Sequence, residues 1–542
     1  MNCKVFPILV LAALACALAP RADAGYAKTD LLWKCDFSPE EAARLGVLEK
    51  IAKGKGGAAE LRPGDGEEGD GALWFRGPAH ISFKPGAALS GLVQIEARVR
   101  GLDITRLPGA KHFHGPKVGM PYTARDKNGK SVKQWPATPV AFGSFAWTTW
   151  VKVLNIPDDA EGLSIHLGLE MTTGEFWVDS LRVWRVEEVS DENVKPPFNA
   201  AAAALPRGRF ANCPNPKALR GVNFFLSQDK PGRQGVIVDE SGEADMAKLE
   251  SWGANLVRVW IQPNGWTTKE EYVKALKPCV GYAKRMLDAA SRHGIKVVLV
   301  LGSCPGCKNT RENSLAVLKD FDSQALAKVW ERLASCFGGH PALYGYDILN
   351  EPGMPAEQWN RVFKEAVTAL RKVDPATPVI TESFSTYWPP SMRVVYSMHP
   401  YQPHDLTHYN AGGSNSVKWR YPGYINGVWW DKEQQRLARK REIEFSAAHP
   451  DARILVGEFS CILWADGAEK WIADAIDLYD EYGWDWCYHA YGSGYSGWNV
   501  EVDHDAKLTP GKWVVPDADT ARKKVLLKGL SRNKTTRKGI RK

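Results

Sequence analysis

Hydrophobic and polar residues alternate along short stretches in the first part of the chain. The alternation is clear in LVQIEARVRGL (Leu92 to Leu102) and in EFWVDSLRVWRVE (Glu175 to Glu187). Successive side chains of a strand point to opposite faces of a sheet, so this period of two indicates strands with one buried face. Polar turns separate the stretches, and few helical periods lie between them. The pattern over residues 25–192 predicts an antiparallel, all-β sandwich.

The pattern changes after a stretch rich in proline and alanine. Residues 193–210 contain VKPPFNAAAAALPRGR, which is typical of a semi-rigid linker. From residue 211 to residue 533, apolar runs of strand length alternate with amphipathic stretches that each end near Gly or Pro. The eight strand candidates are RGVNFFL, NLVRVWI, KVVLVLG, LYGYDILN, PVITES, VVYSMHPY, RILVGEF and WDWCYHAY.

Eight apolar strands that alternate with helices predict an α/β fold of the (β/α)8 TIM-barrel type. A doubly wound open sheet is the alternative. Such sheets usually carry a Gly-rich phosphate-binding turn after the first strand, and no such turn follows RGVNFFL. The barrel is therefore the predicted fold of residues 211–533.

The two ends of the chain carry signals of their own. Residues 1–24 have a basic start, a short apolar segment and a small-residue end, which predicts a signal peptide and a secreted or periplasmic protein, with cell-surface association as a variant. The apolar segment is too short for a membrane span. The formal net charge of +8 is concentrated in the basic tail, residues 534–542, and the residues just before it. The remainder is close to neutral, so no nucleic-acid partner is predicted.

Polar side chains stand at the C-terminal ends of several predicted barrel strands, where the active sites of TIM barrels lie. They are Arg258 on the second strand, Asn350 and Glu351 on the fourth, His399 and Tyr401 on the sixth, Glu458 on the seventh, and His489 and Tyr491 on the eighth. We expect these groups to converge on one mouth of the barrel.

Two facing carboxyl groups suit the cleavage of a glycosidic bond. One must be protonated to assist the departing oxygen, and the other must be charged to meet an oxocarbenium-like carbon. Their separation decides the stereochemical outcome: about 5–5.5 Å for retention and roughly 6.5–9.5 Å for inversion. Glu351 and Glu458 are the predicted pair.

Five motifs of the barrel region resemble glycoside hydrolase family 5, the cellulase-like retaining barrel glycosidases. In chain order they are LRGVNFF, GANLVRVW, LNEPG, MHPY and VGEF. The closing run of the first region, TTGEFWVDSLRVWRVE, is loosely similar to the last strand of jelly-roll carbohydrate-binding modules. The resemblance implies a retaining endo-β-glycosidase that acts on a β-linked polysaccharide or oligosaccharide, without a cofactor or metal.

The resemblance also implies a role for each site residue. Glu351 would be the general acid and then the general base, and Glu458 would be the nucleophile. Asn350 would bind the sugar 2-hydroxyl. Arg258 and Tyr401 would hold Glu458 charged and oriented, because a neighbouring cation lowers the pKa of a carboxyl group.

His399 would lie near Glu351 and govern its protonation, and His489 would contact the sugar. Two positions depart from the family pattern. Many members carry a His after the third strand, where this chain has Gly302 and Ser303. Many also carry a Trp at the end of the eighth strand, where His489 stands here, with Trp486 as the alternative if the register slips. Both departures bear on which glycan is bound.

Aromatic residues of the first region are candidate sugar platforms or core residues. Trp is abundant, with 22 copies, and flat rings stack well on sugar faces. The candidates in the predicted sandwich are Tyr122, Trp135, Trp147 and Trp150.

Other functions compete for the same residues. His399, His404 and His408 invite a zinc site, but Pro403 indicates a loop rather than a helix that would align the last two. A non-catalytic exported sugar-binding protein is the rival from another class, and a transglycosylase is a variation on the same mechanism. For the substrate we expect a β-1,4-glucan first, and a β-mannan or another hemicellulose second. A monomer is the expected state.

Overall fold

The computed structural model describes most of the chain between residues 26 and 539. The ranges left out within it are 48, 50, 55, 70, 108–109, 111–112, 126–128, 189–196, 212–214, 227–240, 264–267, 306, 310–314, 318–321, 410–416, 492–496, 504–515 and 517. The predicted signal peptide, residues 1–24, lies outside the described residues. In the described part, no helix has the length and apolar character needed to cross a membrane.

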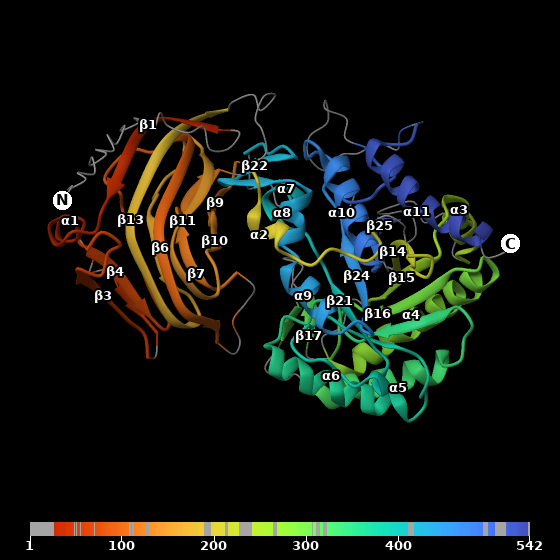
Figure 1. The fold of residues 1–542 in the computed structure, drawn as a ribbon. Helices are drawn as coiled ribbons and strands as arrows, with labels where there is room; N and C mark the ends of the chain where they lie inside the picture. The colour runs from red at the N-terminus through yellow and green to blue at the C-terminus, as the bar shows by residue number, and fades with distance from the viewer. Residues whose placement is uncertain are drawn as a thin grey trace, which may run out of the picture.

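The N-terminal region contains two large antiparallel sheets and a small hairpin of β8 (Tyr122–Arg125) and β9 (Ser131–Gln134), which confirms its all-β class (red to orange in Figure 1). One sheet has the order β11 (Gly143–Ile156), β6 (Gly91–Arg106), β13 (Thr172–Glu188), β4 (Gly71–Arg76) and β3 (Ala58–Pro63), with β1 (Tyr26–Cys35) paired to β13. The other has the order β10 (Ala137–Pro139), β7 (Pro116–Gly119), β12 (Ile165–Leu169), β5 (Ala79–Phe83) and β2 (Ile51–Lys53). The predicted alternation is present: Val93, Ile95 and Val99 of β6 share one buried core with Ile81 and Leu167 of the facing sheet.

The C-terminal region is a closed barrel of eight parallel strands, as predicted (Figure 1). The strands are β14 (Arg220–Leu226), β15 (Leu256–Ile261), β16 (Lys296–Leu301), β19 (Leu343–Asp347), β20 (Val379–Thr381), β21 (Val394–Met398), β24 (Arg453–Phe459) and β25 (Asp485–Tyr491). The helices between and after them include α3 (Glu243–Trp252), α4 (Lys269–Arg292), α5 (Ser323–Phe337), α6 (Ala356–Arg371), α9 (Lys440–Ala448), α10 (Ala468–Tyr482) and α11 (Ala521–Gly539). Helix α11 runs on into the basic tail.

A layer of apolar side chains fills the barrel below the site. It takes one residue from each of six strands: Leu256, Val298, Ile380, Val395, Leu455 and Cys487. Because side chains alternate along a strand, the residue two positions further on points to the same face. On β15 that residue is Arg258, just after β20 it is Glu382, and on β25 it is His489. The same alternation that forms the apolar layer therefore places these polar groups at the C-terminal mouth of the barrel.

The sandwich and the barrel pack against each other. Tyr26, Val153 and Val186 of the sandwich belong to the same buried cluster as the barrel residues. A hairpin of the barrel region, β22 (Gly423–Ile425) and β23 (Val428–Trp430), meets β11, where the side-chain oxygen of Asn426 accepts a hydrogen bond from the Val153 N–H at 3.0 Å.

The predicted linker also packs on the barrel. It contains α2 (Ala200–Ala203), and the Asn199 side chain donates to Gln434 of α8 (Lys432–Leu437) at 2.8 Å.

Candidate active site

Arg258 is the central cation of the barrel mouth. Its guanidinium is fully buried and donates to Glu458 Oε1 at 2.8 Å, to Asn350 Oδ1 at 2.8 Å and to Asp347 Oδ2 at 2.9 Å. Nη1 also donates to Asn223 Oδ1 of β14 at 2.9 Å. Charge-assisted hydrogen bonds of this kind fix several acceptors at once, so one side chain of β15 aligns groups on or just after β14, β19 and β24.

Glu458, at the end of β24, is buried among donors. The Tyr401 hydroxyl donates to its Oε2 at 3.0 Å, Arg258 holds its Oε1, and His489 Nδ1 lies 3.3 Å from Oε2. Burial alone would raise the pKa of this carboxyl group, but the imidazoles of His399 and His489, Arg258 and the Tyr401 hydroxyl outweigh burial and lower its pKa to about 2. Glu458 is therefore charged at neutral pH.

Glu351 sits beyond the end of β19 rather than on the strand itself. The strand ends at Asp347, and Glu351 has a left-handed backbone with φ of 44°, which is rare for a residue with a side chain. Its side chain is more than one-third exposed, and its Oε1 lies 2.9 Å from His399 Nδ1. This carboxyl group faces open solvent and the mouth of the barrel.

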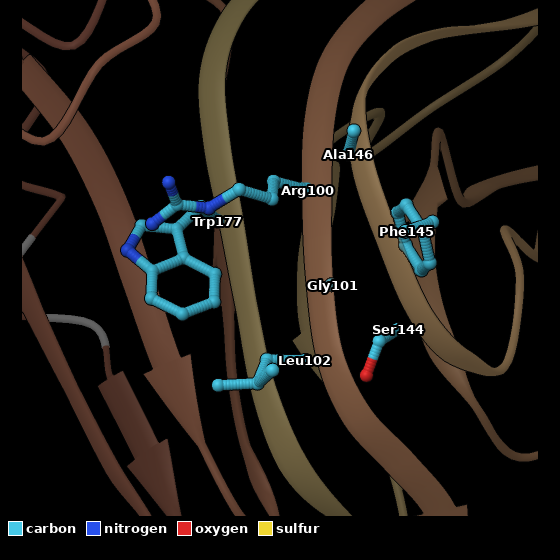
Figure 2. A pocket seen from close by; sticks show the side chains of 7 residues that line it. All are labelled: Arg100, Gly101, Leu102, Ser144, Phe145, Ala146 and Trp177. Atoms are coloured by element: carbon cyan, nitrogen blue, oxygen red, sulfur yellow. The ribbon is translucent and has the colours of Figure 1, made fainter.

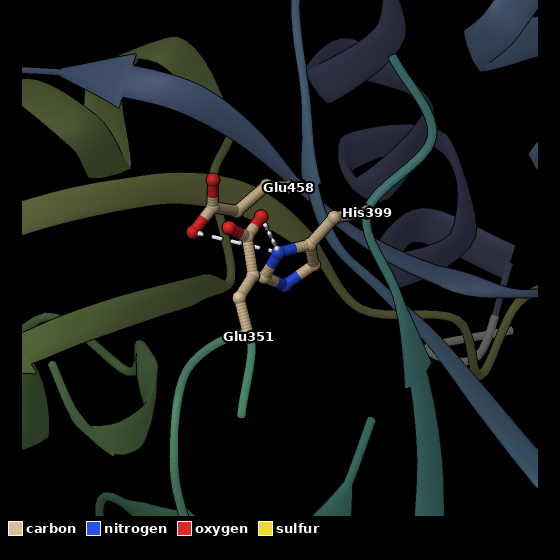
Figure 3. Close-up of side chains that lie close together, drawn as sticks. All are labelled: Glu351, His399 and Glu458. Atoms are coloured by element: carbon tan, nitrogen blue, oxygen red, sulfur yellow. Dashed lines mark hydrogen bonds and ion pairs between the residues drawn. The ribbon is translucent and has the colours of Figure 1, made fainter. Parts of the chain in front are cut away.

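The two carboxyl groups face each other across the mouth (Figure 3). One carboxylate oxygen of Glu351, one of Glu458 and one ring nitrogen of His399 all lie within 4.8 Å of one another. This bound on the nearest oxygen atoms favours the closely set carboxyl pair of retaining glycosidases, at roughly 5–5.5 Å, over the wider pair of inverting ones, at roughly 6.5–9.5 Å. The pair also differs in environment, since Glu458 is buried among cations and Glu351 is solvated on one side.

The structure brings together all seven residues that the sequence singled out as catalytic or substrate-binding. They are Arg258, Asn350, Glu351, His399, Tyr401, Glu458 and His489. The side-chain carbonyl of Asn350 accepts a hydrogen bond from Arg258. Tyr491 does not join them: its buried hydroxyl donates to Asp245 of α3 at 2.6 Å, on the outside of the barrel.

The alternative register of the eighth strand is wrong. Trp486 is completely buried, and its indole N–H donates to Asp480 of α10 at 3.2 Å. It packs between strand and helix and cannot reach the mouth, so His489 is the side chain that β25 presents there. At the third strand, Trp260 packs against the backbone of Gly302, and a Cβ there would lie 3.0 Å from its ring.

The structure adds three residues to the site that the strand-end pattern does not include. Asn223 and Asp347 hold Arg258 from two sides, and Glu382 lies after β20 against Glu351, His399 and Arg258. The signal for Glu382 was present in PVITES, where a Glu follows a buried strand as it does in RILVGEF.

The histidines proposed as a zinc site do not gather on one point, although the residues after Pro403 form the short helix α7 (His404–Thr407) and not the predicted loop. Among the described residues, the one group of three side chains close enough to share a metal ion is Glu351, His399 and Glu458. His404 and His408 contact each other at 3.3 Å through their Nδ1 atoms, and burial lowers the pKa of His408 to about 3. His399 Nδ1 instead lies 2.9 Å from Glu351 Oε1 and 3.8 Å from Glu458 Oε1.

The aromatic candidates of the sandwich differ in their surroundings. Tyr122 is buried, Trp150 packs on the sandwich core, and Trp147 packs beside the buried Trp74 and Trp177. Trp135 is 51% exposed and lies edge-on to His166. Of the four, Trp135 offers the most open ring.

A shallow hollow of about 430 Å³ lies on the same domain, on the outer face of the larger sheet (Figure 2). Arg100 stacks there on Trp177, 4.1 Å from its ring centroid, and Leu102 and Ser144 also line the hollow. This hollow is separate from the carboxyl pair of the barrel.

Comparison with known proteins places the barrel in a family. The model of cellulase (glycosyl hydrolase family 5) matches residues 215–494. A β-xylosidase of Phanerodontia chrysosporium is 32% identical over 149 residues, which cover 24% of this chain and 30% of the relative. A mannan endo-1,4-β-mannosidase of Mytilus edulis is 31% identical over 121 residues, 20% of this chain and 32% of the relative. The chain thus spans about a third of the length of these curated relatives.

Among solved structures, Cel5A of Thermotoga maritima in complex with mannotriose is 20% identical with a TM-score of 0.43, covering 58% of this chain and 98% of that one. The family model spans more than half of the 542 residues and ends just after β25, the last strand of the closed barrel. This chain belongs to glycosyl hydrolase family 5.

Proposed function

We propose that the protein is a retaining glycoside hydrolase that cleaves a β-linked polysaccharide or oligosaccharide, with a β-1,4-glucan as the first candidate. The observation that carries this proposal is the pairing of Glu351 with Glu458 within 4.8 Å across the barrel mouth. One carboxyl group is solvated and the other is buried and charged, as a double displacement requires.

In the first step, a carboxylate oxygen of Glu458 attacks the anomeric carbon of the bound sugar. The bond from that carbon to the glycosidic oxygen breaks, and Glu351 gives its proton to the departing oxygen. The product is a glycosyl ester on Glu458. In the second step, Glu351 takes a proton from water, the water oxygen attacks the same carbon, and Glu458 leaves as a carboxylate.

The neighbours of the pair each support one of these steps. Arg258 and Tyr401 keep Glu458 charged and aimed through hydrogen bonds of 2.8 and 3.0 Å. Asn350, held by its carbonyl, is oriented to offer its amide to the sugar 2-hydroxyl, where hydrogen bonds strengthen in the transition state. His489, beside Glu458, contacts the sugar at the cleavage point.

The proposal ranks two classes of glycan as substrates. A β-mannan or another hemicellulose is the second candidate, supported by relatives named as a β-xylosidase and a mannan endo-1,4-β-mannosidase. Product profiles over time on cellulose, mannan and xylan oligosaccharides would identify the substrate and separate internal from terminal attack. From the pattern of residues 1–24 we also infer export from the cell.

The test uses two isosteric variants and a control. Glu351→Gln and Glu458→Gln should each lower kcat for a natural glycan at least about 1,000-fold, whereas Glu444→Gln, an exposed glutamate of α9, should leave it unchanged. Proton NMR of the first product should show the anomer of the substrate. A non-catalytic sugar-binding protein would show no turnover in any form, and inversion of the anomer would overturn the mechanism.

A further inference from the structure

A third glutamate, Glu382, lies behind the proposed acid. It follows β20, and its side chain is only 8% exposed. Its Oε2 accepts a hydrogen bond from the backbone N–H of Glu351 at 2.9 Å, and its Oε1 lies 3.3 Å from His399 Nε2 and 3.4 Å from Arg258 Nη2. The mechanism above assigns it no step, although it contacts three groups of the site.

The contacts of Glu382 bear on Glu351 from two directions. The Glu382 carboxyl group accepts a hydrogen bond from the backbone N–H of Glu351, and the φ of 44° at Glu351 is unfavourable without such a contact. Through His399, it reaches the other side of the same residue, because His399 Nδ1 lies 2.9 Å from Glu351 Oε1. One side chain therefore constrains both the backbone and the carboxyl group of Glu351.

The charges around Glu382 favour a proton held in this cluster. Four acids, Asp347, Glu351, Glu382 and Glu458, surround two cations, Arg258 and His399. Burial raises the pKa of Glu382 to about 8, with Asp347 and Glu351 acting in the same direction against His399 and Arg258. Burial would lower the pKa of His399, but Glu382, Glu458 and Glu351 together raise it to about 9.

We propose that Glu382 is a positioning residue for Glu351: it fixes the turn that presents the acid and keeps His399 as a donor to its carboxyl group. This inference rests on the proposed function, because it assigns Glu382 to the acid–base half of that reaction. Asp347, by contrast, accepts a hydrogen bond from Arg258, which also donates to Glu458, and so serves the nucleophile half.

The leaving-group dependence of kcat/KM distinguishes these roles. A 2,4-dinitrophenyl glycoside needs little acid assistance, whereas an unsubstituted phenyl glycoside depends on it. Glu382→Ala should therefore lose about tenfold more kcat/KM on the phenyl glycoside than on the dinitrophenyl one. The matched variant Asp347→Asn should lose similar factors on both, because it acts through Arg258 on Glu458.

The pH profile gives a second readout that does not depend on Glu382→Ala being folded. Glu382→Gln keeps an acceptor for the Glu351 N–H but removes the carboxyl group that, once ionised at alkaline pH, supports protonated His399. The alkaline limb of kcat/KM should move to lower pH, away from about 9. The assignment would be overturned if Glu382→Ala lost equal factors of kcat/KM on both glycosides and the alkaline limb of Glu382→Gln stayed at its wild-type pH. An inactive wild-type protein would instead overturn the proposed function itself.

Discussion

At the scale of single residues, the uncharged hydroxyl of Tyr401 helps to keep Glu458 charged and oriented. Its hydroxyl is buried and donates at 3.0 Å to the oxygen that Arg258 does not hold. Tyr401→Phe should lower kcat about 100-fold with little change in KM, because the donor acts on the charge of the nucleophile rather than on the sugar. Tyr387→Phe, which removes a surface hydroxyl bonded to Asp451, is the matched control and should keep full activity.

The lowered pKa of Glu458 makes a prediction about stability. The pKa is about 2 in the folded protein against an ordinary value of 4.5, so its stabilising contribution is complete above about pH 4.5 and is lost as the pH falls through about 2. The contribution is on the order of 3 kcal/mol, at 1.36 kcal/mol per pKa unit. Urea unfolding of the wild type and of Glu458→Gln should therefore converge on acidification. A constant difference between the two from pH 6 to pH 2 would contradict this.

Much of the site could be predicted from residues alone, because TIM barrels place functional groups after their strands. Arg258, Glu458 and His489 follow from that rule together with the motifs around them. Glu382 obeys the same rule, but β20 is only three residues long, and a lone Glu after so short a strand resembles a solvated rim residue. Its burial depends on Arg258 and His399, which come from other strands, and only the folded structure shows that.

At the scale of elements, strand periodicity predicted the eight barrel strands but not their ends. LYGYDILN stops as a strand at Asp347, and the next residues turn so that Glu351 faces the mouth. That turn is set by contacts with Arg258 and Glu382 rather than by local propensity. The hairpin of β22 and β23 is likewise not evident from the sequence, because each of its strands is three residues long and the hairpin contacts β11, which is distant along the chain.

The turn of this hairpin carries a prediction of its own. Asn426 and Gly427 both have positive φ, 49° and 76°, as a tight Asn-Gly hairpin turn requires. The Asn426 side chain also accepts from the Val153 N–H and donates to Asp405 at 2.7 Å.

Asn426→Gly keeps the turn geometry and loses both hydrogen bonds, whereas Asn426→Ala loses the bonds and strains the turn. The free energy of unfolding should fall by about 1–3 kcal/mol for the Gly variant and further for the Ala variant. Denaturant unfolding of the two variants beside the wild type measures the difference. Equal stability of the Gly variant and the wild type would show that the two hydrogen bonds contribute nothing.

At the scale of the whole molecule, the sandwich is joined to the part of the barrel that carries Tyr401. Lys152 of β11 is almost fully buried, and its ammonium lies 2.6 and 2.7 Å from the two oxygens of Asp405 in α7 (His404–Thr407). Thr407 of the same short helix donates to the Tyr401 carbonyl at 2.5 Å. A continuous path of contacts therefore connects the sandwich to the hydroxyl that holds Glu458.

This arrangement favours a sandwich that supports the active site over a separate module on a loose tether. A shared buried cluster and an ion pair between the buried Lys152 and the partly buried Asp405 predict one cooperative unfolding transition for both regions. Calorimetry of the full chain tests this, and two well-separated transitions in the wild type would refute it. The sequence could not show the junction, because its contacts join residues far apart along the chain.

Removing one partner of the ion pair should lower the stability of the protein and disturb the position of Tyr401. Lys152→Met leaves Asp405 largely buried without its cation, which should cost about 2–4 kcal/mol and lower kcat by weakening the support of Tyr401. The double variant Lys152→Met/Asp405→Leu removes both charges and should recover most of the lost stability, since the penalty lies in the uncompensated carboxylate. If Lys152→Met lowered stability while kcat stayed at the wild-type value, the sandwich would be a structural neighbour of the site and not its support.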